Sequence, residues 1–141
     1  MISIWGSFRR KVIETLVLFI AEDPNIRVPA PNRSFRRSIR NACKGVAFMF
    51  LTQRNFRLEL LIFLCTIGLS AFLGLHAFEW ILILQSGFLV LAFESKNTAM
   101  ELSVDLSTME YDYGAKGSKD TSSAAVLIVA LNAVCVGAVI L

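Results

Sequence analysis

The sequence has few charged residues for its length. Only 18% of its 141 residues are Asp, Glu, Lys or Arg, whereas 55% are hydrophobic and the mean hydropathy is +0.62. This composition excludes an ordinary soluble domain, whose surface needs more polar side chains. The length is sufficient for one domain. We therefore expect a small integral membrane protein.

Cysteine, histidine and proline are also scarce. The three cysteines lie far apart and are odd in number, so they indicate neither a disulfide framework nor a metal site. The single histidine, His76, is expected to be structural, in a turn outside the membrane. All three prolines fall within residues 22–32, which predicts an extended linker. The absence of a GxxxxGK[ST] motif excludes a P-loop.

The linker separates an N-terminal extension, residues 1–33, from a main domain, residues 34–141. Within the extension, residues 1–21 place apolar and aromatic side chains at helical spacing against basic ones. Such a helix lies on an anionic membrane face or packs against the rest of the protein, and both alternatives stay open. A second basic amphipathic helix is predicted over residues 34–53, with Ser34 as its N-cap.

Three apolar segments are predicted to span the membrane, at about residues 58–75, 78–93 and 123–141. Eleven of the fourteen Lys and Arg precede Leu58, and the other three lie between the last two segments. The positive-inside rule then places the N-terminus and that loop in the cytoplasm. The predicted fold is all-α, with three transmembrane helices and N-terminal amphipathic interfacial helices. So thin a bundle favours an oligomer, and no nucleic-acid partner is expected.

Residues 94–105, ESKNTAMELSVD, follow the second apolar segment without an intervening Gly or Pro. We expect one helix that leaves the bilayer and continues into the interface. At about 100° per residue, the four polar residues Glu94, Asn97, Glu101 and Asp105 fall on one stripe. Neighbouring carboxylates at a membrane are costly unless a divalent cation offsets their charge. The alternative is a solvated helix end.

The segment between residue 105 and the third span contains Gly114 and Gly117, which permit tight turns. Hydroxyl side chains follow at Thr121, Ser122 and Ser123. Because such side chains cap helices, we expect the last helix to begin there.

The polar residues occur at a distinctive spacing: E-x-x-N-T-A-x-E-x-x-x-D from Glu94 to Asp105, then KDTSSAAVL from Lys119. On this pattern the sequence resembles the small prokaryotic diacylglycerol kinase and undecaprenol kinase family, over about residues 34–141. The resemblance implies a homotrimeric, multi-pass enzyme of the bacterial inner membrane with cytoplasmic active sites shared between subunits. Such an enzyme transfers the γ-phosphate of Mg-ATP to the hydroxyl of a membrane lipid.

The resemblance also implies roles for individual residues. Glu94 matches the general base and Asn97 a residue that orients the phosphate or the base. Glu101 matches a ligand of Mg²⁺, and Gln53 stands where the family usually has a second metal-binding carboxylate. The positions that match ATP contacts are Asn41, Glu101, Glu110, Tyr111, Asp112, Lys119 and Asp120. The positions that match lipid contacts are Arg57, Glu59 and Ser123.

Four positions depart from the family pattern. Asp112 stands where His is usual and Ser34 where a basic residue is common, and the other two are Gln53 and Lys96. The neutral amide of Gln53 is a weaker metal ligand than a carboxylate, and Lys96 replaces a usual aliphatic residue between Glu94 and Asn97. They leave two functions open. One is an active kinase for diacylglycerol or undecaprenol, between which the sequence does not decide. The other is a weakened or inactive homologue that serves as a nucleotide-binding, lipid-binding or structural subunit.

Overall fold

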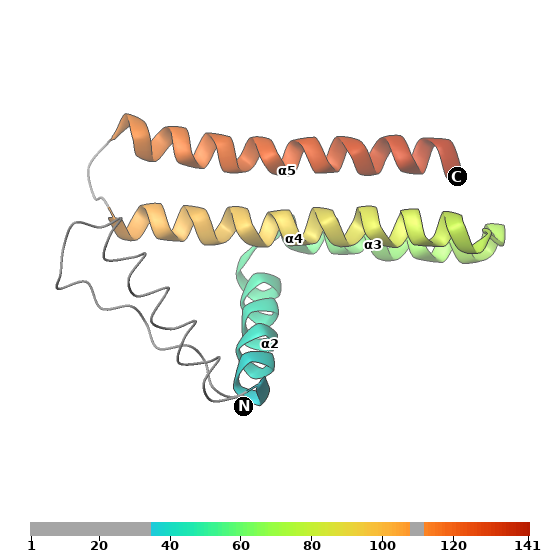
Figure 1. The fold of residues 1–141 in the computed structure, drawn as a ribbon, viewed down its shortest axis with the longest axis horizontal. Coiled ribbons are helices and arrows are strands. Elements are labelled where there is room, and N and C mark those ends of the chain that lie inside the picture. Colours follow the sequence, from blue (N-terminus) through green and yellow to red (C-terminus); the bar gives the residue numbers. More distant parts are fainter. Residues whose placement is uncertain (1–34, 108–111) are drawn as a thin grey trace, which may run out of the picture. The chain divides into compact units, whose positions relative to one another are not determined.

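The computed structural model describes residues 35–107 and 112–141, and the regular secondary structure of this part of the chain is all helical. Its helices are α2 (Phe35–Thr52), α3 (Arg54–Leu73), α4 (Ala77–Ser107) and α5 (Tyr113–Ile140) (Figure 1). Residues 42–141 form one compact unit, in which α3 and α5 each pack along α4. The predicted all-α class is confirmed. The amphipathic helix predicted over residues 1–21, the linker and the Ser34 cap lie outside the described residues.

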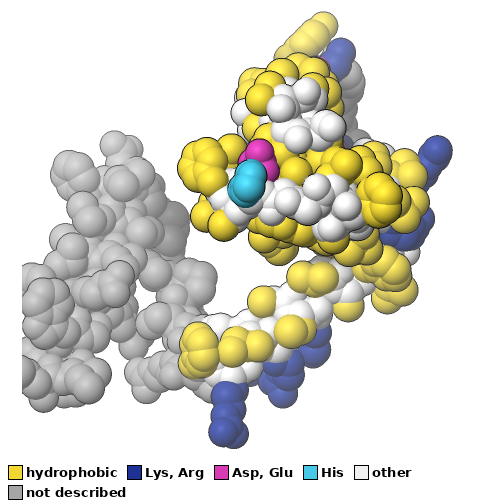
Figure 2. All heavy atoms as spheres, turned by 90° about the vertical axis from the view of Figure 1, so that its right-hand side faces the viewer, with side chains coloured by type: hydrophobic (Ala, Val, Ile, Leu, Met, Phe, Trp, Pro, Cys, Tyr) yellow, Lys and Arg dark blue, Asp and Glu magenta, His cyan; other side chains and the backbone are white. Residues whose placement is uncertain are grey.

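Three of these helices, α3, α4 and α5, are long and apolar enough to cross a membrane. Most of their large apolar side chains are exposed, and no residue of α5 is buried. Figure 2 shows hydrophobic side chains over most of the end of the molecule that contains His76. A surface of this kind is stable in lipid, where the helices satisfy their own backbone hydrogen bonds. The prediction of a membrane protein with three spanning helices is therefore confirmed.

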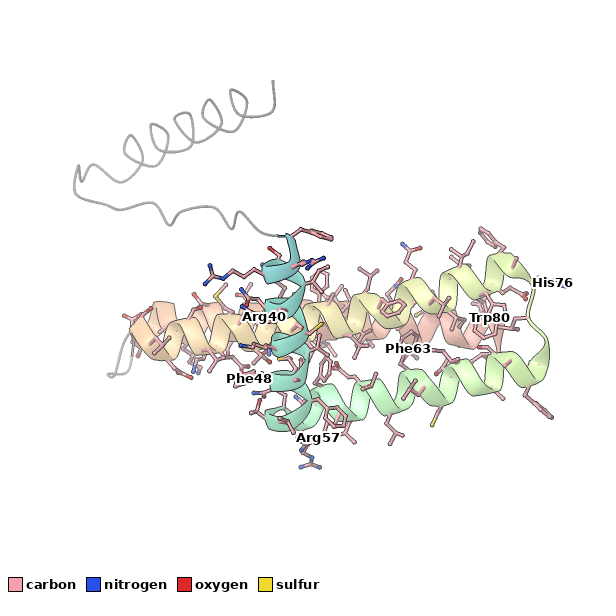
Figure 3. The ribbon with its side chains drawn as sticks, turned by 90° about the horizontal axis from the view of Figure 1, so that it is seen from below. Arg40, Phe48, Arg57, Phe63, His76 and Trp80 are labelled. Carbon is pink, nitrogen blue, oxygen red and sulfur yellow. The ribbon has the colours of Figure 1, made fainter. Side chains whose placement is uncertain are left out.

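The α3–α4 turn is built from local hydrogen bonds. Gly74 ends α3 in the left-handed conformation (φ 69°), which glycine adopts without steric cost. The backbone N–H of His76 donates to Glu79 Oε2 over 2.7 Å, so the Glu79 carboxylate supports the first turn of α4. His76 and Trp80 both lie at this end of the molecule (Figure 3).

Helix α4 runs without a break from Ala77 to Ser107. Its first part is apolar and its last part contains the polar segment 94–105. The predicted single helix is therefore confirmed. Its continuity matters for function because it fixes the polar stripe rigidly to a membrane-spanning segment.

Helix α5 begins earlier than predicted. Asp112 is its N-cap, with an extended backbone (φ −129°, ψ 132°), and its Oδ1 accepts a 2.8 Å hydrogen bond from the Ala115 N–H. The hydroxyl residues 121–123 therefore lie inside the helix, and our expectation that they cap it was wrong. The turns expected at Gly114 and Gly117 are absent as well, since both residues are helical. Each glycine costs about 1 kcal/mol relative to alanine in a helix interior, which a 28-residue helix tolerates.

Candidate active site

The polar stripe of α4 changes from buried to exposed along the helix. Glu94 and Asn97 are only 4% and 7% exposed. Glu101 is half-buried and Asp105 is exposed. Asn97 Nδ2 donates to Glu101 Oε1 over 2.9 Å, the contact expected of residues four apart on a helix. The predicted stripe thus exists, and its most buried carboxylate lies at the apolar end.

Helix α5 contributes two polar side chains to this stripe. Ser123 Oγ donates to Asn97 Oδ1 over 3.4 Å, and Lys119 Nζ forms an ion pair with Asp105 Oδ1. The Asn97 side-chain amide therefore makes two hydrogen bonds: its oxygen accepts from Ser123 of α5, and its nitrogen donates to Glu101. Because residue numbers rise on α4 while they fall on α5, these contacts also show that the two helices are antiparallel.

A fourth carboxylate comes from α3. Glu59 Oε2 is buried and has no hydrogen-bond partner among the described residues. Glu94 is close enough to act on Glu59 by Coulomb repulsion. A buried acceptor without a donor costs free energy of about 1–3 kcal/mol. The site therefore favours a ligand that brings a hydroxyl or another donor to Glu59.

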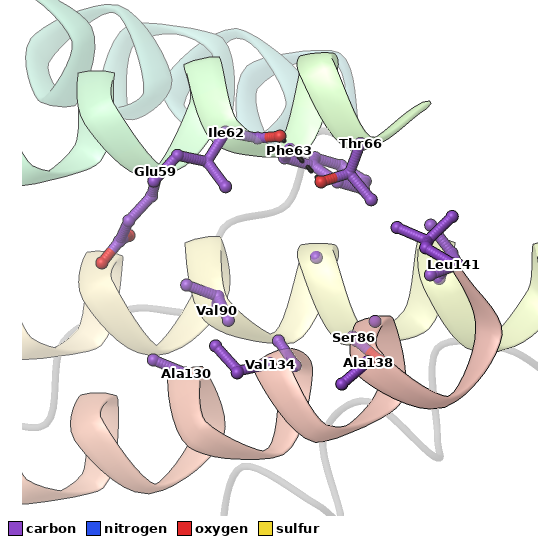
Figure 4. A pocket seen from close by; sticks show the side chains of 14 residues that line it. Glu59, Ile62, Phe63, Thr66, Ser86, Val90, Ala130, Val134, Ala138 and Leu141 are labelled. Carbon is purple, nitrogen blue, oxygen red and sulfur yellow. Dashed lines mark hydrogen bonds between the residues drawn. The ribbon is translucent and has the colours of Figure 1, made fainter. Parts of the chain in front are cut away.

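Glu59 lies at one end of a cavity of about 440 Å³ between α3, α4 and α5 (Figure 4). The lining is mostly apolar, and residues such as Ile62, Val90 and Val134 contribute to it. The two hydroxyls in the lining already donate to the backbone, that of Thr66 to Ile62 O and that of Ser86 to Leu82 O. The cavity is therefore suited to an apolar molecule with a polar group at the Glu59 end.

The junction between α2 and α3 contains two of the predicted site residues. Arg57 Nη1 donates to the carbonyl oxygens of Phe50 and Leu51, each over 3.1 Å. Its positive charge thereby stabilises the C-terminal end of α2. Gln53 joins the two helices, and its Nε2 donates to Thr52 Oγ1 over 3.2 Å. In this structure Arg57 and Gln53 thus make structural contacts within their own junction.

The remaining predicted residues lie on α2, at the start of α5 and within it, or outside the described residues. Asn41 and Asp120 are exposed on α2 and α5, and Asp112 caps α5. Glu110 and Tyr111 lie outside the described residues. Within residues 35–107 and 112–141, no group of three or more His, Cys, Asp and Glu side chains is arranged to hold a metal ion. The ion pair between Lys119 and Asp105 does not follow from the sequence pattern, although Asp105 belongs to the predicted stripe.

The helical unit is similar in sequence to known proteins. The family model described as prokaryotic diacylglycerol kinase matches residues 40–141. The chain is 38% identical over 105 residues to a diacylglycerol kinase of Synechocystis sp., and this match covers 74% of the chain and 60% of the relative. It is 32% identical over 98 residues to diacylglycerol kinases of Escherichia coli K12 and Shigella flexneri. Each of these matches covers 70% of the chain and 80% of the relative. The chain thus spans less than two thirds of the length of the Synechocystis relative.

Proposed function

Because the chain belongs to the prokaryotic diacylglycerol kinase family, we propose that it phosphorylates the hydroxyl of a membrane lipid with ATP as the phosphate donor. The observation that carries this proposal is the buried Glu94 carboxylate at the end of a membrane helix. It lies where the hydroxyl of a lipid and a nucleotide from the aqueous side can meet. The Asn97–Glu101 hydrogen bond places further polar groups one and two turns away.

Glu94 acts as the general base in this proposal. Its carboxylate accepts the proton of the lipid hydroxyl while the hydroxyl oxygen forms a bond to the γ-phosphorus of ATP. The bond from that phosphorus to the bridging oxygen breaks, and ADP leaves. Asn97 orients the reacting groups, and its own orientation is held by Glu101 and Ser123.

Glu101 is the described residue best suited to hold Mg²⁺. It is a half-buried carboxylate beside the buried end of the stripe, and hard cations prefer such oxygen ligands. Magnesium in kinases is commonly held by one or two carboxylates together with the phosphates, so a single carboxylate with a weak amide ligand at Gln53 fits this mode. Bound Mg²⁺ supplies charge neutralisation for the phosphates.

The nucleotide is proposed to bind on the polar side of the stripe. Lys119, half-buried on α5, provides the positive charge for the phosphates, and Asp120 follows it on the same helix. The family resemblance adds Asn41, Glu110, Tyr111 and Asp112 as further nucleotide contacts. Asp112 is already used as the N-cap of α5, so a nucleotide contact there requires its second carboxylate oxygen.

The lipid is proposed to occupy the cavity between α3, α4 and α5. Its apolar chain contacts the apolar lining, and its polar end lies near Glu59, whose Oε2 has no hydrogen-bond partner among the described residues. By resemblance to the family, Ser123 and Arg57 are proposed as further contacts of the lipid. The names of the relatives favour diacylglycerol as the acceptor, and undecaprenol is the second lipid to test.

We further propose that the protein is a homotrimer in the bacterial inner membrane, with its N-terminus and active site on the cytoplasmic side. One observation supports an oligomer. Helix α5 has no buried residue, which leaves its Ala- and Gly-containing face available for another subunit. Residues 1–33 are proposed as an extension and residues 34–141 as the kinase domain.

A weakened or inactive homologue is the second candidate function, favoured by the neutral Gln53. The deciding experiment supplies the purified protein in detergent micelles with Mg-ATP and either diacylglycerol or undecaprenol. We expect ADP release to depend on the lipid, with the phosphorylated lipid identified by mass spectrometry. If the folded oligomer turns over neither lipid, the kinase proposal is wrong and the second function stands.

A further inference from the structure

The ion pair between Lys119 and Asp105 is the most solvent-accessible contact of the polar stripe. The Lys119 side chain is 35% exposed and that of Asp105 is 62% exposed. The two residues belong to different helices, α5 and α4. Asp105 is the last acidic residue of α4, and no step of the proposed reaction uses it.

The pair draws the lysine away from the buried end of the site. Asp105 lies one helical turn beyond Glu101 and two turns beyond Asn97, about 6 and 12 Å at 1.5 Å per residue. Ser123, one turn after Lys119 on the antiparallel α5, is level with Asn97. The Lys119 side chain is therefore directed along the stripe toward the exposed end, opposite to Glu94.

We propose that Asp105 is a positioning residue that holds Lys119 in a resting position until nucleotide binds. The inference rests on the proposed function, in which the ATP phosphates contact Lys119. The phosphates and the Asp105 carboxylate then compete for one ammonium group. Asp105 thus lowers the apparent affinity for ATP and keeps the lysine charge compensated in the empty site.

The size of the effect follows from the exposure of the pair. A partly exposed ion pair contributes about 0.4–1 kcal/mol, which corresponds to a change of roughly two- to fivefold in a binding constant. A pair that served only to join α4 to α5 would act differently. Its loss would lower thermal stability or kcat, and it would leave the KM for ATP unchanged.

The test measures lipid phosphorylation by the full chain in mixed micelles, as a function of ATP at saturating lipid. In Asp105→Asn we expect the KM for ATP to fall by roughly two- to fivefold, with kcat close to that of the wild-type protein. Asp105→Glu keeps the carboxylate and should return the KM toward the wild-type value. Glu79→Gln, at the far end of the same helix, is the matched control and should leave the KM for ATP unchanged.

A second comparison tests whether the effect of Asp105→Asn on ATP binding requires Lys119. In a Lys119→Met background, Asp105→Asn should change neither the KM for ATP nor the binding of Mg-ADP, because the group for which the two anions compete is gone. A rise or no change of the KM in Asp105→Asn alone would overturn the inference while the kinase activity stands. A wild-type protein that phosphorylates no lipid and binds no nucleotide would overturn the proposed function and this inference together.

Discussion

Gly87 of α4 lies directly against the ring of Phe63 on α3. A Cβ atom added at Gly87 would stand 2.2 Å from two of the ring carbons, far inside van der Waals contact. The same ring packs edge-on against Phe88, with 5.2 Å between ring centroids. The close approach of α3 to α4 therefore requires glycine at position 87. The distance from Glu59 to Glu94 depends on the same approach.

Gly87→Ala should destabilise the α3–α4 contact, because the Phe63 ring must move or the helices must separate. Overpacking of this kind costs about 1–3 kcal/mol. We expect a lower thermal transition in detergent and a lower kcat. Gly68→Ala is the matched control, since no atom lies within 4 Å of a Cβ at that position. A Gly87→Ala protein as stable as the Gly68→Ala protein would show that this packing is not tight.

Glu94→Gln tests the general base. The amide has the same shape as the carboxylate and accepts no proton, so kcat should fall by roughly 10²–10⁴-fold while the protein still binds nucleotide. The assay is phosphorylation of the preferred lipid, with Mg-ADP binding as the check on folding. Glu79→Gln, another carboxylate of α4, serves as the control and should retain activity. If Glu94→Gln kept its activity, another group would have to accept the proton.

Much of the site could be predicted from the spacing of residues on one helix. Glu94, Asn97, Glu101 and Asp105 share a face of α4 because of helical geometry alone, and the Asn97–Glu101 hydrogen bond follows from their spacing of four. The contacts of Ser123 with Asn97 and of Lys119 with Asp105 could not be predicted in this way. They depend on the register between α4 and α5, which interhelical packing sets and local sequence does not encode.

The start of α5 shows a different limit of sequence analysis. Both Asp112 and the hydroxyl residues 121–123 are good helix caps, and two glycines between them favoured the later start. The helix begins at the earlier cap because Asp112 satisfies the Ala115 N–H and no proline follows within the helix. As a result, Lys119 and Asp120 are held on a rigid helix, where a loop had been expected. This placement gives the lysine a defined direction toward Asp105.

Gln53→Glu tests whether the α2–α3 junction faces the metal. A carboxylate would add a second charged ligand, so the Mg²⁺ concentration for half-maximal activity should fall severalfold. The measurement is a Mg²⁺ titration of lipid phosphorylation at fixed ATP. Thr52→Val is the control, because it removes the hydroxyl that Gln53 contacts without adding charge. An unchanged titration for Gln53→Glu would place the metal site away from this junction.

Ala133→Phe tests the cavity as the lipid site. Ala133 lines the cavity, and a phenyl ring there would occupy part of its roughly 440 Å³. We expect the KM for the lipid to rise and the KM for ATP to stay the same, because the nucleotide is proposed to bind at the polar stripe. Val139→Phe also adds a ring to α5, at a position that is 87% exposed and outside the cavity lining, and should change neither constant. Equal lipid KM values for the two variants would mean that the acyl chain binds elsewhere, and the partner for Glu59 would then have to come from another molecule.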